Sequence, residues 1–238
     1  MEAAVANVVL VHGAWGDESV WDGVTAALQD QGHRVLAVRL PMTSLEADLA
    51  WTRQQLATVD GPVTLVGHSY GGVVISAVAH QNAQVTALVF VAAYAPDAAE
   101  SSVTLNSHGG ERRGRAAIRF GEDGWTTLDP GLCGEAFGPD LPEATVKALA
   151  AAQRPTHLTC FSTPSGPGAW RDLPCAYVLS ADDQIFDPGL QRWLAERTNA
   201  TVTELNAGHF SLISRPGEVA AAICAMLGDA DPAGVTTV

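Results

Sequence analysis

A serine between two glycines is the residue with the clearest chemical potential in this sequence. Gly67-His68-Ser69-Tyr70-Gly71 has the pattern G-x-S-x-G. Residues 62–66 before it are apolar and β-branched, which favours a buried strand, and residues 72–80 after it are small and apolar, which favours a buried helix. On the sharp turn between such a strand and helix, a serine Oγ is exposed. We therefore predict that Ser69 is a nucleophile; the alternative is a serine that only fills a tight turn.

His209 is the best-placed histidine to activate this serine. A serine hydroxyl is a weak nucleophile near neutral pH and needs an adjacent base. His209 follows the predicted strand 201–205, so it lies at the edge where the strands of a parallel sheet end, as Ser69 does. The competing histidines are placed less well. His33 begins a predicted strand and His80 ends a predicted helix, while His108 and His157 lie in the region 97–170. His68 flanks the serine but points away from it.

An acid that orients the histidine is expected between serine and histidine in the chain. Asp182 and Asp183 follow the predicted strand 175–180, and an aspartate there can accept a hydrogen bond from the imidazole Nδ1–H. Asp182 can instead cap the turn, and Asp187 is expected to cap the next helix. Asp97 is a further, weaker candidate. We favour Asp183.

Acyl transfer also needs hydrogen-bond donors for the oxyanion of the tetrahedral intermediate. The backbone N–H of Tyr70, one residue past the serine, is one candidate donor. The loop after the first strand supplies the other, and we choose the N–H of Ala14 in His12-Gly13-Ala14-Trp15. His12 is expected to hold this loop by hydrogen bonding, and Trp15 either lines the pocket or belongs to the core.

The elements that must position these residues alternate between strand and helix patterns along the chain. Predicted strands cover 7–11, 34–39, 62–67, 85–92, 175–180 and 201–205, and predicted helices cover 18–31, 44–59, 70–82, 188–198 and 216–227. This alternation predicts an α/β fold, with a mostly parallel, doubly wound sheet and helices on both of its faces.

The alternation stops between residues 97 and 170. This stretch is rich in glycine, proline and charge, and only residues 142–152 have a helical pattern. We therefore divide the chain into an α/β core (1–96 and 171–228), an inserted lid (97–170) and a flexible tail (229–238). Aromatic residues of the lid are expected to line the substrate pocket, the alternative being local lid core: Phe120, Trp125, Phe137 and Phe161.

Composition restricts the classes of function that this protein can have. With 238 residues, of which 47% are hydrophobic, the chain is long enough for one α/β domain with a large core. A formal net charge of −13 argues against nucleic acid as a partner.

We expect no metal site, because no histidine forms an H-E-x-x-H motif and the cysteines stand far apart as free thiols: Cys133, Cys160, Cys175 and Cys224.

The sequence predicts neither a membrane span nor an exported protein. The longest apolar run, 87–95, is much shorter than the ~18 residues of a membrane-spanning helix. Residues before the first strand lack the basic region of a signal peptide, so we expect a cytoplasmic protein.

Four arginines gather within the lid, against the acidic background of the chain: Arg112, Arg113, Arg115 and Arg119. The simpler interpretation is a solvated surface segment. The alternative is that this cluster forms a positive rim that attracts substrates with a carboxylate.

Together these segments resemble the α/β-hydrolase fold superfamily, and more narrowly its compact branch of bacterial esterases, plant methylesterases and plant hydroxynitrile lyases. The resemblance lies in residues 10–15, 67–72, 181–186 and 207–210. In that branch the acid usually stands two residues before an isoleucine-like position, which supports Asp183 over Asp182. The resemblance does not extend to the details of the lid.

Two departures from the branch argue against lyase chemistry. Its hydroxynitrile lyases have a threonine at the position of Gly13 and a lysine just after the catalytic histidine, where this chain has Phe210. A lyase of this kind needs the lysine charge beside the departing cyanide. Related epoxide hydrolases and dehalogenases carry an aspartate as nucleophile, which Ser69 excludes.

We therefore expect a serine esterase that cleaves carboxylic esters of small or medium apolar substrates through an acyl-enzyme, without a cofactor. The expected substrate-binding residues are Trp15, Phe120, Trp125, Phe137, Phe161 and Phe210. Three alternatives remain open: a lactonase or amidase that uses the same residues, a biosynthetic cyclase or decarboxylase, and a ligand-binding protein built on the same fold.

Overall fold

A parallel sheet of six strands forms the centre of the protein, in a computed structural model that describes residues 5–229. The strand order is β2-β1-β3-β4-β8-β9, and every pair of neighbours is parallel. The strands are β1 (Asn7–Val11), β2 (Arg34–Val38), β3 (Val63–His68), β4 (Val85–Val91), β8 (Cys175–Ser180) and β9 (Thr201–Leu205).

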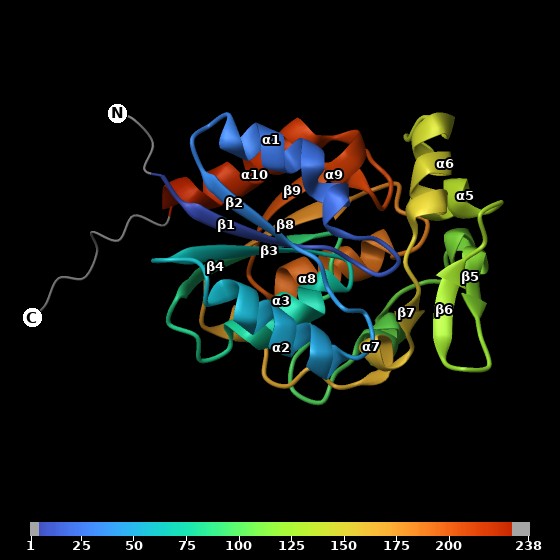
Figure 1. The fold of residues 1–238 in the computed structure, drawn as a ribbon, viewed down its shortest axis with the longest axis horizontal. Helices are drawn as coiled ribbons and strands as arrows, with labels where there is room; N and C mark the ends of the chain where they lie inside the picture. Colours follow the sequence, from blue (N-terminus) through green and yellow to red (C-terminus); the bar gives the residue numbers. More distant parts are fainter. Residues whose placement is uncertain (1–4, 230–238) are drawn as a thin grey trace, which may run out of the picture.

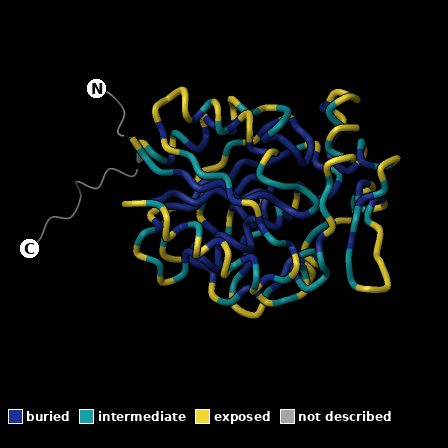
Figure 2. The backbone as a smooth tube through the Cα atoms, viewed as in Figure 1, coloured by how far each residue is buried: buried dark blue, intermediate teal, exposed yellow. Residues whose placement is uncertain are grey.

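Helices cover both faces of this sheet (Figure 1). One face carries α1 (Asp22–Gln29), α9 (Ser211–Ser214) and α10 (Pro216–Asp229), and the other carries α2 (Leu45–Leu56), α3 (Gly71–Ala79) and α8 (Pro188–Arg197). Every residue of β3 and α3 is buried, because helices cover the central strand on both sides. Figure 2 shows the sheet as the buried centre of the molecule. The predicted fold class is confirmed.

The predicted elements of the core agree closely with those of the structure. Each predicted strand has a counterpart whose ends differ by at most one residue. The predicted helix 18–31 is divided into a short 3-10 helix, η1 (Glu18–Trp21), and α1. The predicted tail 229–238 lies outside the described residues, apart from Asp229 at the end of α10.

The region between β4 and β8 contains a second, antiparallel sheet that the sequence did not predict. Its strands are too short for an alternating pattern to be recognised: β5 (Ile118–Phe120), β6 (Trp125–Leu128) and β7 (Thr156–His157). The helix expected at 142–152 is present as α6 (Glu143–Ala152). The remaining short elements are α4 (Ser102–Leu105), η2 (Asn106–His108), η3 (Arg113–Ala117), α5 (Cys133–Phe137), α7 (Thr159–Ser162) and η4 (Ala169–Arg171).

Hydrogen bonds attach this inserted region to the loop after β1. The backbone N–H of Trp15 donates to Thr156 Oγ1 at 3.0 Å, and its indole Nε1–H donates to Thr126 Oγ1 at the same distance. The carbonyl of Trp15 accepts the N–H of Arg154. The insertion packs beyond the carboxyl ends of the central strands, as Figure 1 shows for β5, β6 and α6. It therefore borders the edge where Ser69 and His209 lie.

Candidate active site

Ser69 lies on a sharp turn between β3, which ends at His68, and α3, which begins at Gly71. Its φ of +53° is in the left-handed region, which is unusual for a residue other than glycine. The turn fits against the loop after β1 so closely that a Cβ at position 71 would overlap the backbone oxygen of Val11. The glycine at position 71 is therefore a steric requirement of the turn that exposes Ser69 Oγ.

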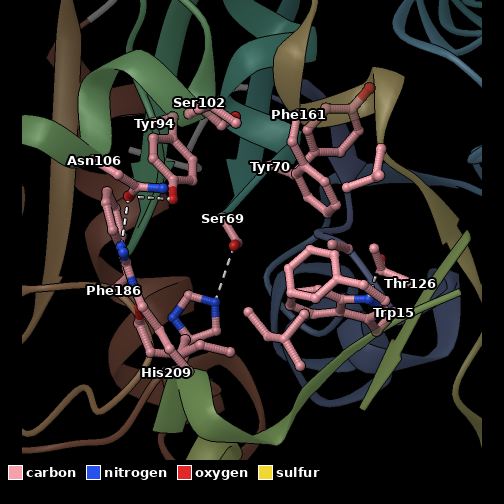
Figure 3. Close-up of a pocket in the computed structure, with 17 residues that line it drawn as sticks. Trp15, Ser69, Tyr70, Tyr94, Ser102, Asn106, Thr126, Phe161, Phe186 and His209 are labelled. Carbon is pink, nitrogen blue, oxygen red and sulfur yellow. Dashed lines mark hydrogen bonds between the residues drawn. The ribbon is translucent and has the colours of Figure 1, made fainter. Parts of the chain in front are cut away.

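Ser69, His209 and Asp183 form a continuous chain of hydrogen bonds (Figure 3 shows its first link). Ser69 Oγ lies 2.9 Å from His209 Nε2, and His209 Nδ1 lies 2.6 Å from Asp183 Oδ2. The carboxylate accepts a hydrogen bond from Nδ1–H and so keeps the proton on that nitrogen, which leaves Nε2 as the acceptor that faces the serine hydroxyl. The structure thus brings together the three residues that the sequence singled out.

The buried carboxylate of Asp183 is surrounded by hydrogen-bond donors. Its Oδ1 accepts the backbone N–H groups of Ile185 at 2.9 Å and Phe186 at 2.8 Å. Its Oδ2 accepts the side-chain Nε2–H of Gln191 at 3.0 Å in addition to the imidazole. These hydrogen bonds satisfy both oxygens of a carboxylate that is fully buried.

The other aspartates that the sequence considered do not contact His209. Asp182 is exposed to solvent. Asp97 forms an ion pair with Arg171, whose guanidinium holds the pKa of that carboxyl far below its usual range. Asp187 caps helix α8, as expected, by accepting the N–H of Leu190.

Two backbone N–H groups near Ser69 are available to bind an oxyanion. Within residues 5–229, no acceptor takes the N–H of Ala14 or Tyr70, whereas the neighbouring N–H groups of Trp15 and Ser69 are both engaged. Free N–H groups beside a nucleophile are the usual components of an oxyanion hole.

His12 orients the peptide that carries the Ala14 N–H. Its Nε2 accepts the N–H of Leu40 at 3.0 Å, so Nδ1 carries the proton and donates to the carbonyl of Gly13 at 2.7 Å. Burial lowers the pKa of His12 from 6.5 to about 4, which keeps the ring neutral. Because C=O and N–H of a trans peptide point in opposite directions, the bond to Gly13 directs the Ala14 N–H away from His12.

His68 supports His209 from the interior of the protein. Its Nε2–H donates to the backbone carbonyl of His209 at 2.9 Å, and the two rings lie 4.7 Å apart. Burial and the neighbouring His209 both hold the pKa of His68 well below its usual value. The ring is therefore neutral, and its contact fixes the backbone of the candidate base.

A cavity of about 340 Å³ opens above Ser69 and His209 (Figure 3). This volume is within the usual range for small-molecule sites. Its walls are mostly aromatic and aliphatic with a few polar groups: Ala14, Trp15, Ser69, Tyr70, Tyr94, Ser102, Val103, Asn106, Arg115, Ile118, Phe120, Thr126, Leu158, Phe161, Ile185, Phe186 and His209.

Comparison with known proteins identifies the family. Residues 8–222 match the model of the alpha/beta hydrolase family. This chain is an alpha/beta hydrolase. The resemblance inferred from the sequence motifs is thereby confirmed.

The relatives of this alpha/beta hydrolase include proteins named as an esterase or a hydrolase and proteins named as a synthase. The carbendazim hydrolyzing esterase of Nocardioides sp. (strain SG-4G) is 36% identical over a region that spans 42% of this chain and 47% of that protein. Norfluorocurarine synthase 1 of Strychnos nux-vomica is 24% identical over 88% of this chain and 91% of its own. The structure of a pyrethroid hydrolase from Sphingobium faniae JZ-2 superposes with a TM-score of 0.83 at 24% identity, covering 94% of this chain and 98% of the other.

Three of the six residues expected to bind substrate line the cavity of this alpha/beta hydrolase. Trp15 and Phe161 pack against each other in its wall, with ring centroids 5.6 Å apart. Phe120 also belongs to the wall but is 68% exposed, so it lies at the mouth.

Trp125, Phe137 and Phe210 are not among the lining residues, which corrects the expectation for these three. Trp125 and Thr126 are consecutive in β6, so their side chains point to opposite faces, and Thr126 takes the face toward the cavity. Phe137 and Phe210 pack edge to face at 4.7 Å, both buried. They form a hydrophobic contact between the insertion and the loop of His209.

Several lining residues were not predicted from the sequence. Tyr94 follows β4 at the same edge of the sheet as Ser69, and Ile185 and Phe186 stand two and three residues after Asp183. Their places after strands were the available signal. Ser102 and Asn106 had no such signal, because they come from the inserted region, whose path the sequence does not predict.

The four arginines of the cluster have different partners in the structure. Arg112 pairs with Asp187 at 2.8 Å, Arg119 pairs with Asp129 at 2.8 Å, and Arg113 donates to the side chain of Gln184. Three of the four arginines of the hypothetical rim do not line the cavity: Arg112, Arg113 and Arg119. Arg115 lines it instead.

Within the described part of the chain, no three histidine, cysteine or acidic side chains gather in a way that could hold a metal ion. The same residues include no helix that is both long and apolar enough to cross a membrane. The four cysteines are free thiols, as expected.

Proposed function

We propose that this alpha/beta hydrolase cleaves carboxylic esters through an acyl-enzyme on Ser69. The observation that carries the proposal is the hydrogen-bonded chain Ser69–His209–Asp183 at the floor of a cavity, with unoccupied N–H groups beside it. The kinship with proteins named as esterases and hydrolases supports the same reaction.

In the first half of the reaction, His209 Nε2 takes the proton of Ser69 as Oγ attacks the ester carbonyl. The negative charge that develops on the carbonyl oxygen is stabilised by the N–H groups of Ala14 and Tyr70. Asp183 holds the imidazole in place and stabilises the imidazolium. His209 then protonates the leaving alcohol, and the acyl group stays on Ser69.

In the second half, His209 removes a proton from a water molecule that attacks the acyl-enzyme. The same two N–H groups stabilise the second oxyanion, and the imidazolium returns the proton to Ser69. No cofactor takes part in these steps. The cavity volume of about 340 Å³ and its largely apolar walls favour small or medium apolar esters. The net charge of −13 supports small molecules rather than nucleic acid as partners.

The relationship with norfluorocurarine synthase 1 favours one second candidate, a biosynthetic reaction other than hydrolysis. Lactones and amides can also be attacked by the same residues. Comparing kcat/KM over a panel of esters, lactones and amides separates the three substrate classes. An acyl-enzyme on Ser69, detected by intact mass, separates all three from a reaction without acyl transfer.

The test is labelling with a fluorophosphonate probe, followed by intact mass measurement and ester kinetics. Wild type and Ser107→Ala, a control at an exposed serine, should take up one probe per chain. Ser69→Ala and His209→Ala should not label, and each should lose at least ~10³ in kcat. A folded wild type that does not label, or either variant with more than a tenth of the activity, would contradict the proposal.

A further inference from the structure

The cavity has two chemically different sides, which Figure 3 shows on either side of Ser69. Trp15 and Phe161 form the aromatic side. The opposite side contains polar groups from the inserted region, which we call the polar subsite: Ser102, Asn106 and Arg115. The proposed ester hydrolysis does not use any of these three side chains.

Arg115 is a cation without an acidic partner. Its Nε–H donates to the backbone carbonyl of Ile185 at 3.0 Å, and its Nη2–H donates to Asn106 Oδ1 at 2.6 Å. Both acceptors are neutral, and no carboxylate of the described residues lies within 4.0 Å of the guanidinium, whereas Arg112 and Arg119 each have one. Arg115 is also partly buried, which weakens its solvation by water.

The side chain of Asn106 is held in one orientation by two donors. Its Oδ1 accepts both the Tyr94 hydroxyl at 2.9 Å and the Arg115 guanidinium at 2.6 Å. These two bonds identify the oxygen of the carboxamide, so Nδ2 is the other terminal atom. No described residue accepts the Nδ2 N–H groups. Asn106 thus offers donors to a bound molecule.

Ser102 supplies the second, independent indication of a ligand. The residue is 2% exposed and lines the same cavity, and its buried Oγ has no hydrogen-bond partner among the described residues. Ser102 and Asn106 are four positions apart on α4 and η2, so they share one face of this helical segment. Buried hydroxyl groups normally have partners, so this one is suited to bind a ligand atom.

We propose that the polar subsite binds a carboxylate carried by the ester substrate, at a distance from the ester group that Ser69 attacks. The three side chains present a hydroxyl, an amide N–H and a guanidinium, and a carboxylate has the acceptor oxygens that match them. It also supplies the counter-ion that Arg115 lacks. The proposal rests on the proposed ester hydrolysis and adds a substrate class, namely half-esters of dicarboxylic acids.

The first experiment compares three series of ethyl esters whose acyl chains end in a carboxylate, in a methyl ketone or in an isopropyl group. The chain length is varied over four to eight carbons, and release of acid is followed at constant pH. Wild type should show a higher kcat/KM for one or more carboxylate esters than for both neutral esters of the same length. A preference for the ketone, or no preference, would overturn the proposal.

Variants then assign the preference to the polar subsite. In Arg115→Gln, the ratio of kcat/KM for carboxylate over isopropyl esters should fall by about tenfold to a hundredfold, since a charge-assisted hydrogen bond is lost. Arg115→Lys should retain part of the ratio, and Ser102→Ala should lower it through KM. Arg119→Gln removes an equal charge outside the cavity and should leave the ratio unchanged.

A binding measurement keeps the subsite separate from the reaction. In the Ser69→Ala background, calorimetry with the best monoethyl ester should give a dissociation constant that increases about tenfold or more on Arg115→Gln. Turnover by Ser69→Ala would contradict the proposed function but not the subsite. An unchanged dissociation constant would contradict the subsite, even if esterase activity is intact.

Discussion

The close contact between Gly13 and Ser69 leads to a sharp prediction about catalysis. A Cβ added at position 13 would lie 2.7 Å from Ser69 Cβ, 3.0 Å from His68 Nδ1 and 3.1 Å from the His68 carbonyl oxygen. Non-bonded carbon atoms prefer about 3.5 Å or more, so Gly13→Ala must move the loop or the serine by roughly 0.8 Å. The φ of Gly13 is not in the left-handed region, so the effect is a matter of contact alone.

Both ways of relieving this contact disturb the proposed active site. Moving Ser69 lengthens its bond to His209, and moving the loop displaces the N–H of Ala14. A misplacement of about 1 Å in an active site can cost about a hundredfold in rate, and overpacking costs about 1–3 kcal/mol of stability. We therefore expect kcat of Gly13→Ala to fall by about tenfold to a hundredfold, with a smaller change in KM.

The assay measures kcat and KM on one ester, the rate of fluorophosphonate labelling and the free energy of unfolding in urea. Gly16→Ala is the matched control in the same loop. Its Cβ would lie 3.3 Å from the end of the Val20 side chain, which can move by a few tenths of an ångström, and 4.0 Å from the Gly13 carbonyl oxygen. The reasoning is refuted if Gly13→Ala keeps kcat within about threefold of wild type, or if Gly16→Ala loses as much.

Two further predictions concern stability. Tyr70→Phe removes the hydroxyl that donates to Asp48 Oδ2 at 2.8 Å and leaves that oxygen with only the thiol of Cys160 at 3.6 Å. The free energy of unfolding in urea should fall by about 1.5–3 kcal/mol, and a loss below ~0.5 kcal/mol would contradict this account. The second prediction is a pH dependence. Because burial lowers the pKa of His12 from 6.5 to about 4, the unfolded chain binds a proton in this range that the folded chain does not. The free energy of unfolding should therefore decrease as pH falls from 6.5 to about 4, by about 3 kcal/mol from His12 alone, with His68 acting in the same direction. Urea titrations at several pH values measure it, and an equal slope in His12→Asn would count against it.

Much of the core was predictable because its signals are local. The strand and helix patterns on either side of Ser69 depend on residues that are neighbours in the chain, and so does the capping of α8 by Asp187. The rule that parallel strands end at one edge then places Ser69, Asp183 and His209 near one another. These residues and their order are properties of the sequence.

The cavity was much less predictable, because its walls depend on how the insertion folds back over the core. Trp125 was expected to face the substrate, but the alternation within the short β6 turns Thr126 inward instead. Arg115 could not be distinguished from its neighbours in the sequence, since its lack of an acidic partner depends on where Asp187 and Asp129 lie.

The sequence by itself determined the α/β fold, the nucleophile turn and the residue types of the proposed triad. Local patterns and strand order are enough for that. Only the tertiary structure decided which aromatic residues line the cavity, which N–H groups stay free and which arginine faces the substrate space. These properties arise from contacts between segments far apart in the chain, such as Trp15 with Thr126 and Arg115 with Asn106. Their geometry depends on packing that no short stretch of sequence encodes.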